Sequence, residues 1–183
     1  EKWVRAERAI RELLILDPRD HWLWTRLSLC LHEQRKYALA LRASQTALAL
    51  EPHCPLALWD CAGALDMLGR KKDAIQLWKR LIRRGEASLA HGRCGEGLRW
   101  ARMLVNDSRY RTGLAYARLG RTQIALRYIR THLSERGRRV PSIYPKKEVL
   151  RHFGRITGAS RAKAVDDVPT APVTVAVSLA DKL

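Results

Sequence analysis

Four cysteines and six histidines are the side chains of this 183-residue chain best suited to bind a metal ion. Cys54 directly follows His53, and Cys94 lies three residues after His91. A structural zinc site needs four ligands, most of them in short local pairs, and the sequence has no Cys-x-x-Cys pair. We therefore predict no metal site and no cofactor.

Residues that could carry catalysis are equally sparse. The best candidates for a nucleophile and an adjacent polar group are Ser142 and Tyr144. Both lie between Pro141 and Pro145, in a segment that the prolines keep extended. No general base stands beside them, which nucleophilic catalysis requires. We predict that the chain is not an enzyme. Its cysteines fit a reduced, cytoplasmic protein.

Basic residues are concentrated in the second part of the chain. The formal charge is +17. Residues 1–69 hold nine Lys or Arg and nine Asp or Glu, whereas residues 70–163 hold 25 against six. This asymmetry predicts attraction to an anionic partner. Arginine outnumbers lysine, and its planar fork suits carboxylates and phosphates. Four arginines recur along one segment that we expect to be helical: Arg99, Arg102, Arg111 and Arg118.

The elements that position these residues repeat with a fixed period. Leu50-Glu51-Pro52 echoes Leu16-Asp17-Pro18, so that the two prolines lie 34 residues apart. Each period contains two segments of about 12–15 residues with apolar positions at i, i+3, i+4 and i+7, which predicts paired helices. Neither helix pair can bury its apolar face alone, so the pairs must stack.

The same residue types recur at matching positions of two successive units, 21–54 and 55–88. In the first unit they are Trp24, Leu27, Ser28, Leu31, Tyr37, Ala40, Ala47 and Pro52. In the second they are Leu58, Cys61, Ala62, Leu65, Gly69, Ala74, Trp78 and Leu81. This pattern resembles the tetratricopeptide repeat family. The resemblance implies an all-α fold, a right-handed helix-turn-helix solenoid.

The remaining segments complete this expected solenoid. Residues 1–18 match the second helix of a truncated leading repeat, and residues 89–139 match a further unit with about 17 extra residues. In that unit we predict one long first helix over 97–119. Residues 140–156 should form a proline connector and a capping helix, and residues 157–183 a disordered tail. No apolar run is long enough to span a membrane, so we predict no membrane association.

The resemblance also implies where a partner would bind, because the first helix of each unit lines the concave groove in this family. The groove positions with anchoring potential are Trp22, Leu29, Trp59 and Tyr110, and the four arginines would extend them as a cationic surface. Packing within the core is the alternative role of Trp22. The positions of the clamp that binds chaperone tails in some family members hold other residue types: Thr25, Leu29, Leu56, Asp60 and Gly63.

Two functions remain open. The first is a non-catalytic scaffold or adaptor that binds an acidic or amphipathic protein segment in the groove. The second is an RNA- or ribosome-associated repeat protein, in which Trp100, Tyr110, Tyr116 and Tyr128 would stack on bases. Self-association through exposed groove aromatics is a further expectation, and the charge could also be a solvated face without a specific partner.

Overall fold

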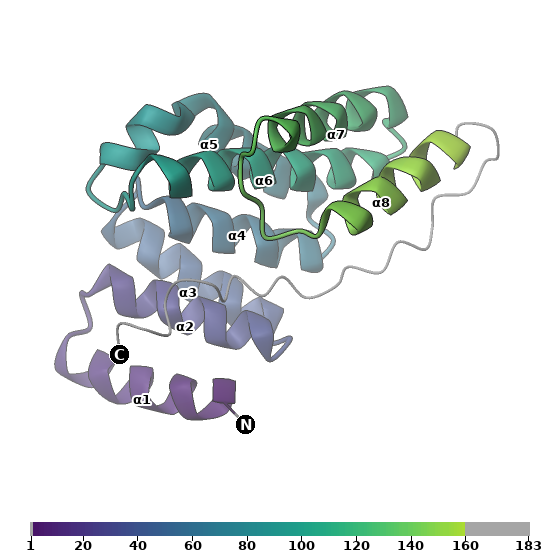
Figure 1. Cartoon of the computed structure of the whole chain (residues 1–183). Helices are drawn as coiled ribbons and strands as arrows, with labels where there is room; N and C mark the ends of the chain where they lie inside the picture. Colours follow the sequence, from purple (N-terminus) through teal and green to yellow (C-terminus); the bar gives the residue numbers. More distant parts are fainter. Residues whose placement is uncertain (1, 160–183) are drawn as a thin grey trace.

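The computed structural model describes residues 2–159, whose regular structure is helical throughout (Figure 1). The helices are α1 (Lys2–Leu16), α2 (His21–Glu33), α3 (Tyr37–Leu50), α4 (Pro55–Met67), α5 (Lys71–His91), α6 (Leu98–Arg118), α7 (Thr122–Gly137) and α8 (Lys146–Ala159). Each helix packs on the next, and the pairs stack into one layered body (Figure 1). The prediction of an all-α helix-turn-helix solenoid is confirmed.

The same turn joins the two helices of each of three pairs, α2 with α3, α4 with α5 and α6 with α7. Arg35, Gly69 and Gly120 occupy its left-handed position, with φ of 60°, 80° and 71°. In each turn the following backbone N–H bonds to a carbonyl five residues back, at 2.9 Å in all three, which closes the helix end. The turns lie 34 and 51 residues apart, so the third pair carries 17 extra residues.

Small side chains lie where the helices of a pair approach most closely. Ser28 of α2 is fully buried and its hydroxyl donates to the carbonyl of Ala40 in α3, at 2.9 Å. Gly113 takes the corresponding place in α6: a Cβ atom there would lie 2.7 Å from Cγ1 of Ile129 and 3.1 Å from the carbonyl oxygen of Ala125. The separation of the helices is therefore set by residues that cannot be enlarged without a shift.

Gly113→Ala is expected to destabilise the chain by about 1–3 kcal/mol, because the overpacking at the α6–α7 contact outweighs the gain in helix propensity. Urea unfolding measures the difference. Gly154→Ala is the control, since nothing lies within 4 Å of a Cβ at that helical glycine, and it should be neutral or stabilising. Equal stabilisation by both substitutions would contradict the close approach.

The extra residues of the third pair extend α5 and form the loop before α6. Gly85 interrupts α5 with a φ of 73° and a ψ of 167°, so the helix changes direction there and continues to His91. The long helix predicted over 97–119 is observed as Leu98–Arg118. Arg93 and Cys94 of the insertion contact Glu51 and His21, so the insertion lies against the preceding repeats.

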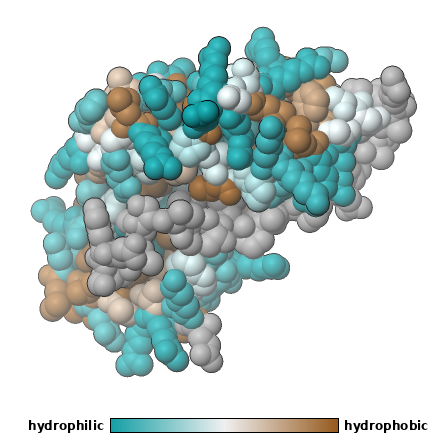
Figure 2. Space-filling view, in the orientation of Figure 1, coloured by the Kyte–Doolittle hydropathy of each residue, from teal (hydrophilic) through white to brown (hydrophobic). Residues whose placement is uncertain are grey.

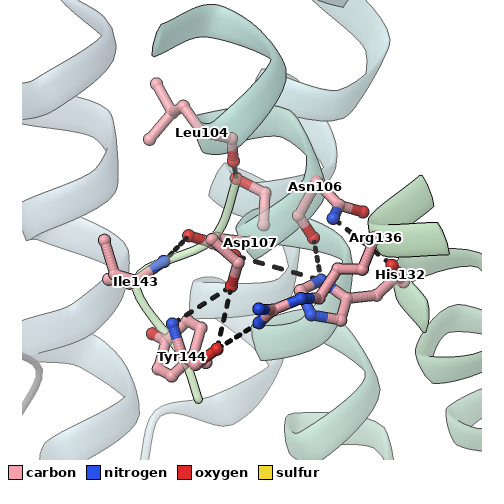
Figure 3. A network of polar contacts seen from close by, with 9 residues as sticks. Leu104, Asn106, Asp107, His132, Arg136, Ile143 and Tyr144 are labelled. Carbon is pink, nitrogen blue, oxygen red and sulfur yellow. Dashed lines mark hydrogen bonds and ion pairs between the residues drawn. The ribbon is translucent and has the colours of Figure 1, made fainter. Parts of the chain in front are cut away.

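The proline connector binds against α6 and α7 (Figure 3). The backbone N–H of Ile143 donates to Asp107 of α6 at 3.0 Å, and the guanidinium of Arg136 in α7 donates to the carbonyl of Tyr144. The capping helix expected to end near 155 continues to Ala159 as α8. The tail expected from 157 is thus helical over its first three residues, and residues 160–183 lie outside the described part of the chain.

Candidate partner-binding groove

A pocket opens across the first helices of the three pairs. Leu29 and His32 of α2 line it, with Trp59, Asp60 and Gly63 of α4. Two further residues complete the lining: Trp78 of α5 and Arg111 of α6. Its volume is about 320 Å³, including the open mouth. We call this hollow the groove pocket. It brings together three of the residues chosen from the sequence: Leu29, Trp59 and Arg111.

The shape of the groove pocket depends on one glycine and two tryptophans. A Cβ atom at Gly63 would lie 3.7 Å from Nε2 of His32, an ordinary contact, so the missing side chain leaves space rather than avoiding a clash. The rings of Trp59 and Trp78, which both line the pocket, lie 6.5 Å apart at 58°. Trp59 is only 5% exposed, so a ligand would reach a small part of its side chain.

Two titratable groups of the pocket, Asp60 and His32, carry little charge at neutral pH. Burial raises the pKa of Asp60 to about 8, although Arg26 opposes this rise. Burial also lowers the pKa of His32 to about 4, and the charge of Arg111 adds to this effect. Asp60 is therefore largely protonated and His32 neutral. Both side chains can form hydrogen bonds with an acidic ligand without repelling its charge.

Arg111 and Arg118, expected to form part of a cationic surface, are instead paired with a buried carboxylate. Asp66 of α4 accepts from Nη2 of Arg111 at 3.0 Å and from Nη1 of Arg118 at 2.9 Å. The side chain of Arg111 is 5% exposed, and its guanidinium lies 5.2 Å from the centroid of the Trp78 ring. A buried guanidinium is stable only with a paired negative charge. Arg111 therefore links α6 to α4, and its charge is not available to a partner.

Tyr110, expected to anchor a partner in the groove, is fully buried. Its hydroxyl forms a hydrogen bond with Nδ1 of His152 in α8, and its ring contacts that of Tyr144 at 4.7 Å. The connector and α8 therefore cover this end of the inner surface. Tyr110 is a core residue, and the accessible groove lies over α2 and α4.

Three other residues chosen from the sequence lie outside the groove pocket. Trp22 is half-buried beneath Arg26, whose guanidinium lies 4.5 Å from its ring, and it packs beside Cys54. Arg99 and Arg102 are exposed near the start of α6, where Arg102 pairs with Glu86 at 3.1 Å. The structure does not bring them to the pocket.

Two exposed arginines of α8, Arg151 and Arg155, were not singled out in the sequence. Arg151 and Arg155 are exposed, lie four residues apart on one helical face, and form no ion pair among the described residues. Burial lowers the pKa of His152 to about 4, and the charges of Arg151, Arg155 and Arg118 lower it further. Arg151, Arg155 and Arg118 therefore act together on the buried His152. Their spacing in the sequence was the available signal.

Comparison with known proteins supports the repeat assignment. Residues 31–92 match the model of the tetratricopeptide repeat family. A crystal structure of MamA superposes with a TM-score of 0.58 at 16% identity, covering 88% of this chain and 90% of that one. A second MamA crystal structure gives the same TM-score at 17% identity, covering 93% and 90%. No curated protein sequence matches the chain. The expected resemblance to tetratricopeptide repeats is confirmed, and the neighbours share the solenoid fold.

None of the helices within residues 2–159 has both the length and the apolar character needed to cross a bilayer. Apolar side chains do reach the surface at the α1 end of the molecule (Figure 2). The exposed large apolar residues of α1 are Val4, Leu13, Ile15 and Leu16.

Proposed function

We propose that the chain is a non-catalytic protein-interaction scaffold that holds an amphipathic, acidic segment of a partner protein in its groove. The groove pocket carries this proposal, because it draws its lining from three successive helix pairs. Tryptophan edges and Leu29 offer apolar contact, and Trp-lined pockets anchor partners at low entropic cost. Asp60 and His32 add hydrogen-bonding groups without charge at neutral pH.

The charge near α8 supports an acidic partner. A segment with an apolar residue in the groove pocket and carboxylates toward α8 would meet Arg151 and Arg155, which lack ion-pair partners among the described residues. Arginine binds carboxylates through paired hydrogen bonds. The apolar anchor would supply affinity, and the arginines would supply orientation and association rate.

The aromatic residues that would stack on RNA bases are already engaged. Tyr110 is buried, and the rings of Tyr116 and Tyr128 stack on each other at 5.8 Å. Trp100 is half-buried and packs beside Cys54. Stacking platforms for single strands need free faces. The protein-binding function is therefore better supported than the RNA-binding alternative.

Gly63→Leu is the sharpest test, because it fills the groove pocket and also favours the α4 helix. Trp59→Ala would instead open a cavity in the core. We expect Gly63→Leu to weaken binding of amphipathic acidic peptides, selected on a synthetic array with the unmodified chain, by at least about tenfold, or 1.4 kcal/mol. Fluorescence anisotropy measures the affinity.

Gly137→Leu is the matched control, since nothing lies within 4 Å of a Cβ at that exposed position, and it should bind as the unmodified chain does. Unchanged binding by Gly63→Leu would contradict the groove assignment. A labelled single-stranded RNA is the second probe. Tight RNA binding at physiological salt, falling steeply as salt rises, would favour the alternative function.

A further inference from the structure

A cluster of three metal-ligating side chains lies outside the groove. The donor atoms of His21, Cys54 and Cys94 all lie within 4.8 Å of one another. The Sγ atom of Cys94 lies 3.3 Å from Nε2 of His21. Tetrahedral zinc with ordinary bond lengths separates sulfur from nitrogen by about 3.5 Å and two sulfurs by about 3.8 Å. The three donors could therefore close on one ion with small movements.

The insertion between α5 and α6 brings Cys94 to the cluster. A Cβ atom at Gly95 would lie 2.3 Å from the carbonyl oxygen of Ala90, so the loop can turn back tightly on α5 only with glycine there. Arg93, the residue before Cys94, pairs with the buried Glu51 at 3.0 Å. The loop that carries Cys94 is thus fixed on both sides of this cysteine.

Cys54 and His21 are held by the repeat framework itself. Cys54 is fully buried and is the residue before α4. Arg80 of α5 donates to the carbonyl of Pro52 at 3.0 Å, which ties the turn before Cys54 to α5. His21 is the first residue of α2, whose start is capped by Asp20 at 2.7 Å. Three elements distant in sequence therefore present their ligands to one point.

The surroundings suit a thiolate-bound cation. Trp22, Trp24 and Trp100 pack against the core cluster that contains Cys54. A cation bound between the two cysteines would stabilise their thiolate forms.

We propose that His21, Cys54 and Cys94 form a binding site for a thiophilic metal ion, Zn²⁺ in the first instance. Two thiolates and one neutral imidazole balance the charge of Zn²⁺ and match its preference for sulfur and nitrogen ligands. The fourth position is left to solvent, because Cys94 and His21 are only half-buried. Binding releases thiol protons and ties the insertion to the start of α2 and to the junction before α4.

The test is a titration of the reduced chain with Co²⁺, which replaces zinc and reports its ligands by absorption. We expect one equivalent to give thiolate-to-cobalt charge transfer and intense visible bands of a four-coordinate ion, removed by equimolar Zn²⁺. Quenching of tryptophan fluorescence should follow the same curve, because of the adjacent Trp22, Trp24 and Trp100. Cys94→Ala and His21→Ala should each weaken binding more than about 100-fold, since loss of a mere supporting group costs about 10–100-fold.

The two remaining cysteines provide the matched control. Cys30 and Cys61 are buried elsewhere in the core, and Cys30→Ala and Cys61→Ala should keep the full cobalt spectrum. Circular dichroism confirms that each variant is folded, and Cys94→Ala, in a loop, should fold normally. Absence of charge transfer in the reduced chain would overturn the proposal. A spectrum unchanged by Cys94→Ala and His21→Ala would overturn it as well.

Discussion

Replacement of Asp66 by alanine is expected to destabilise the chain by about 3–5 kcal/mol, which is the usual cost of leaving a buried charge without its partner. The side chains of Asp66 and Arg111 are 2% and 5% exposed, and their contact at 3.0 Å joins α4 to α6. Arg118 also loses its only ion pair among the described residues, although it is 14% exposed and can turn toward water. Urea unfolding followed by circular dichroism measures the loss.

Two further variants separate this ion pair from other causes. Asp73→Ala removes the partner of Arg70 in an exposed pair, with side chains 56% and 51% exposed, and should cost less than about 1 kcal/mol. The double variant Asp66→Leu with Arg111→Met removes both buried charges and should recover most of the stability. If the double variant is as unstable as Asp66→Ala, the loss of stability does not come from the unpaired charge of Arg111.

The architecture could be predicted because the repeat fixes it locally. The turn residues Gly69 and Gly120, the small residue Gly113 and the prolines at a 34-residue interval each have a conformational reason to recur. The long helix α6 followed from an uninterrupted apolar pattern. The interruption of α5 at Gly85 did not, since glycine is often tolerated within a helix and its φ depends on the packing of the insertion.

The candidate site was predictable only where repeat register determines it. Leu29 and Trp59 reach the groove pocket because they sit at inner positions of α2 and α4. Tyr110 has the same register, but its exposure depends on α8, which folds back from a position 42 residues later. The pairing of the Arg111 charge likewise depends on Asp66, 45 residues away. Register alone carries no information on such distant partners.

The proposed metal-binding cluster could not be predicted from the sequence for a related reason. His21, Cys54 and Cys94 are separated by 33 and 40 residues, and no short motif connects them. Searching the sequence for local pairs led to His53 and His91 instead. Stacking of the repeats and the return of the loop at Gly95 bring the three ligands together, so the cluster is a product of tertiary structure.

The chain is expected to lose stability as the pH falls from about 6.5 toward 4, and His132 should contribute a loss of at most about 1.4 kcal/mol per pH unit, near the middle of that range. Burial lowers the pKa of His132 to about 4, the hydrogen bond to Asn106 opposes this effect, and Arg136 and Arg109 lower the pKa further. Its Nδ1 donates to the carbonyl of Asn106 at 2.9 Å (Figure 3), whereas its buried Nε2 has no hydrogen-bond partner among the described residues. A second proton would therefore enter a site without an acceptor, while the unfolded chain binds it readily.

His132→Gln keeps an amide N–H for the carbonyl of Asn106 but cannot titrate, so it isolates this contribution. Between about pH 6.5 and pH 5 the unmodified chain should lose about 1.5 kcal/mol more than the variant, measured as the difference in free energy of unfolding in urea. Burial raises the pKa of Asp107 to about 7, so protonation of this carboxyl stabilises the chain as the pH falls, in both proteins. Taking the difference between the two proteins removes this shared contribution. Parallel pH profiles for the unmodified chain and His132→Gln would mean that the folded chain accommodates a charged His132, and the buried polar network of Figure 3 would then have to rearrange to provide an acceptor.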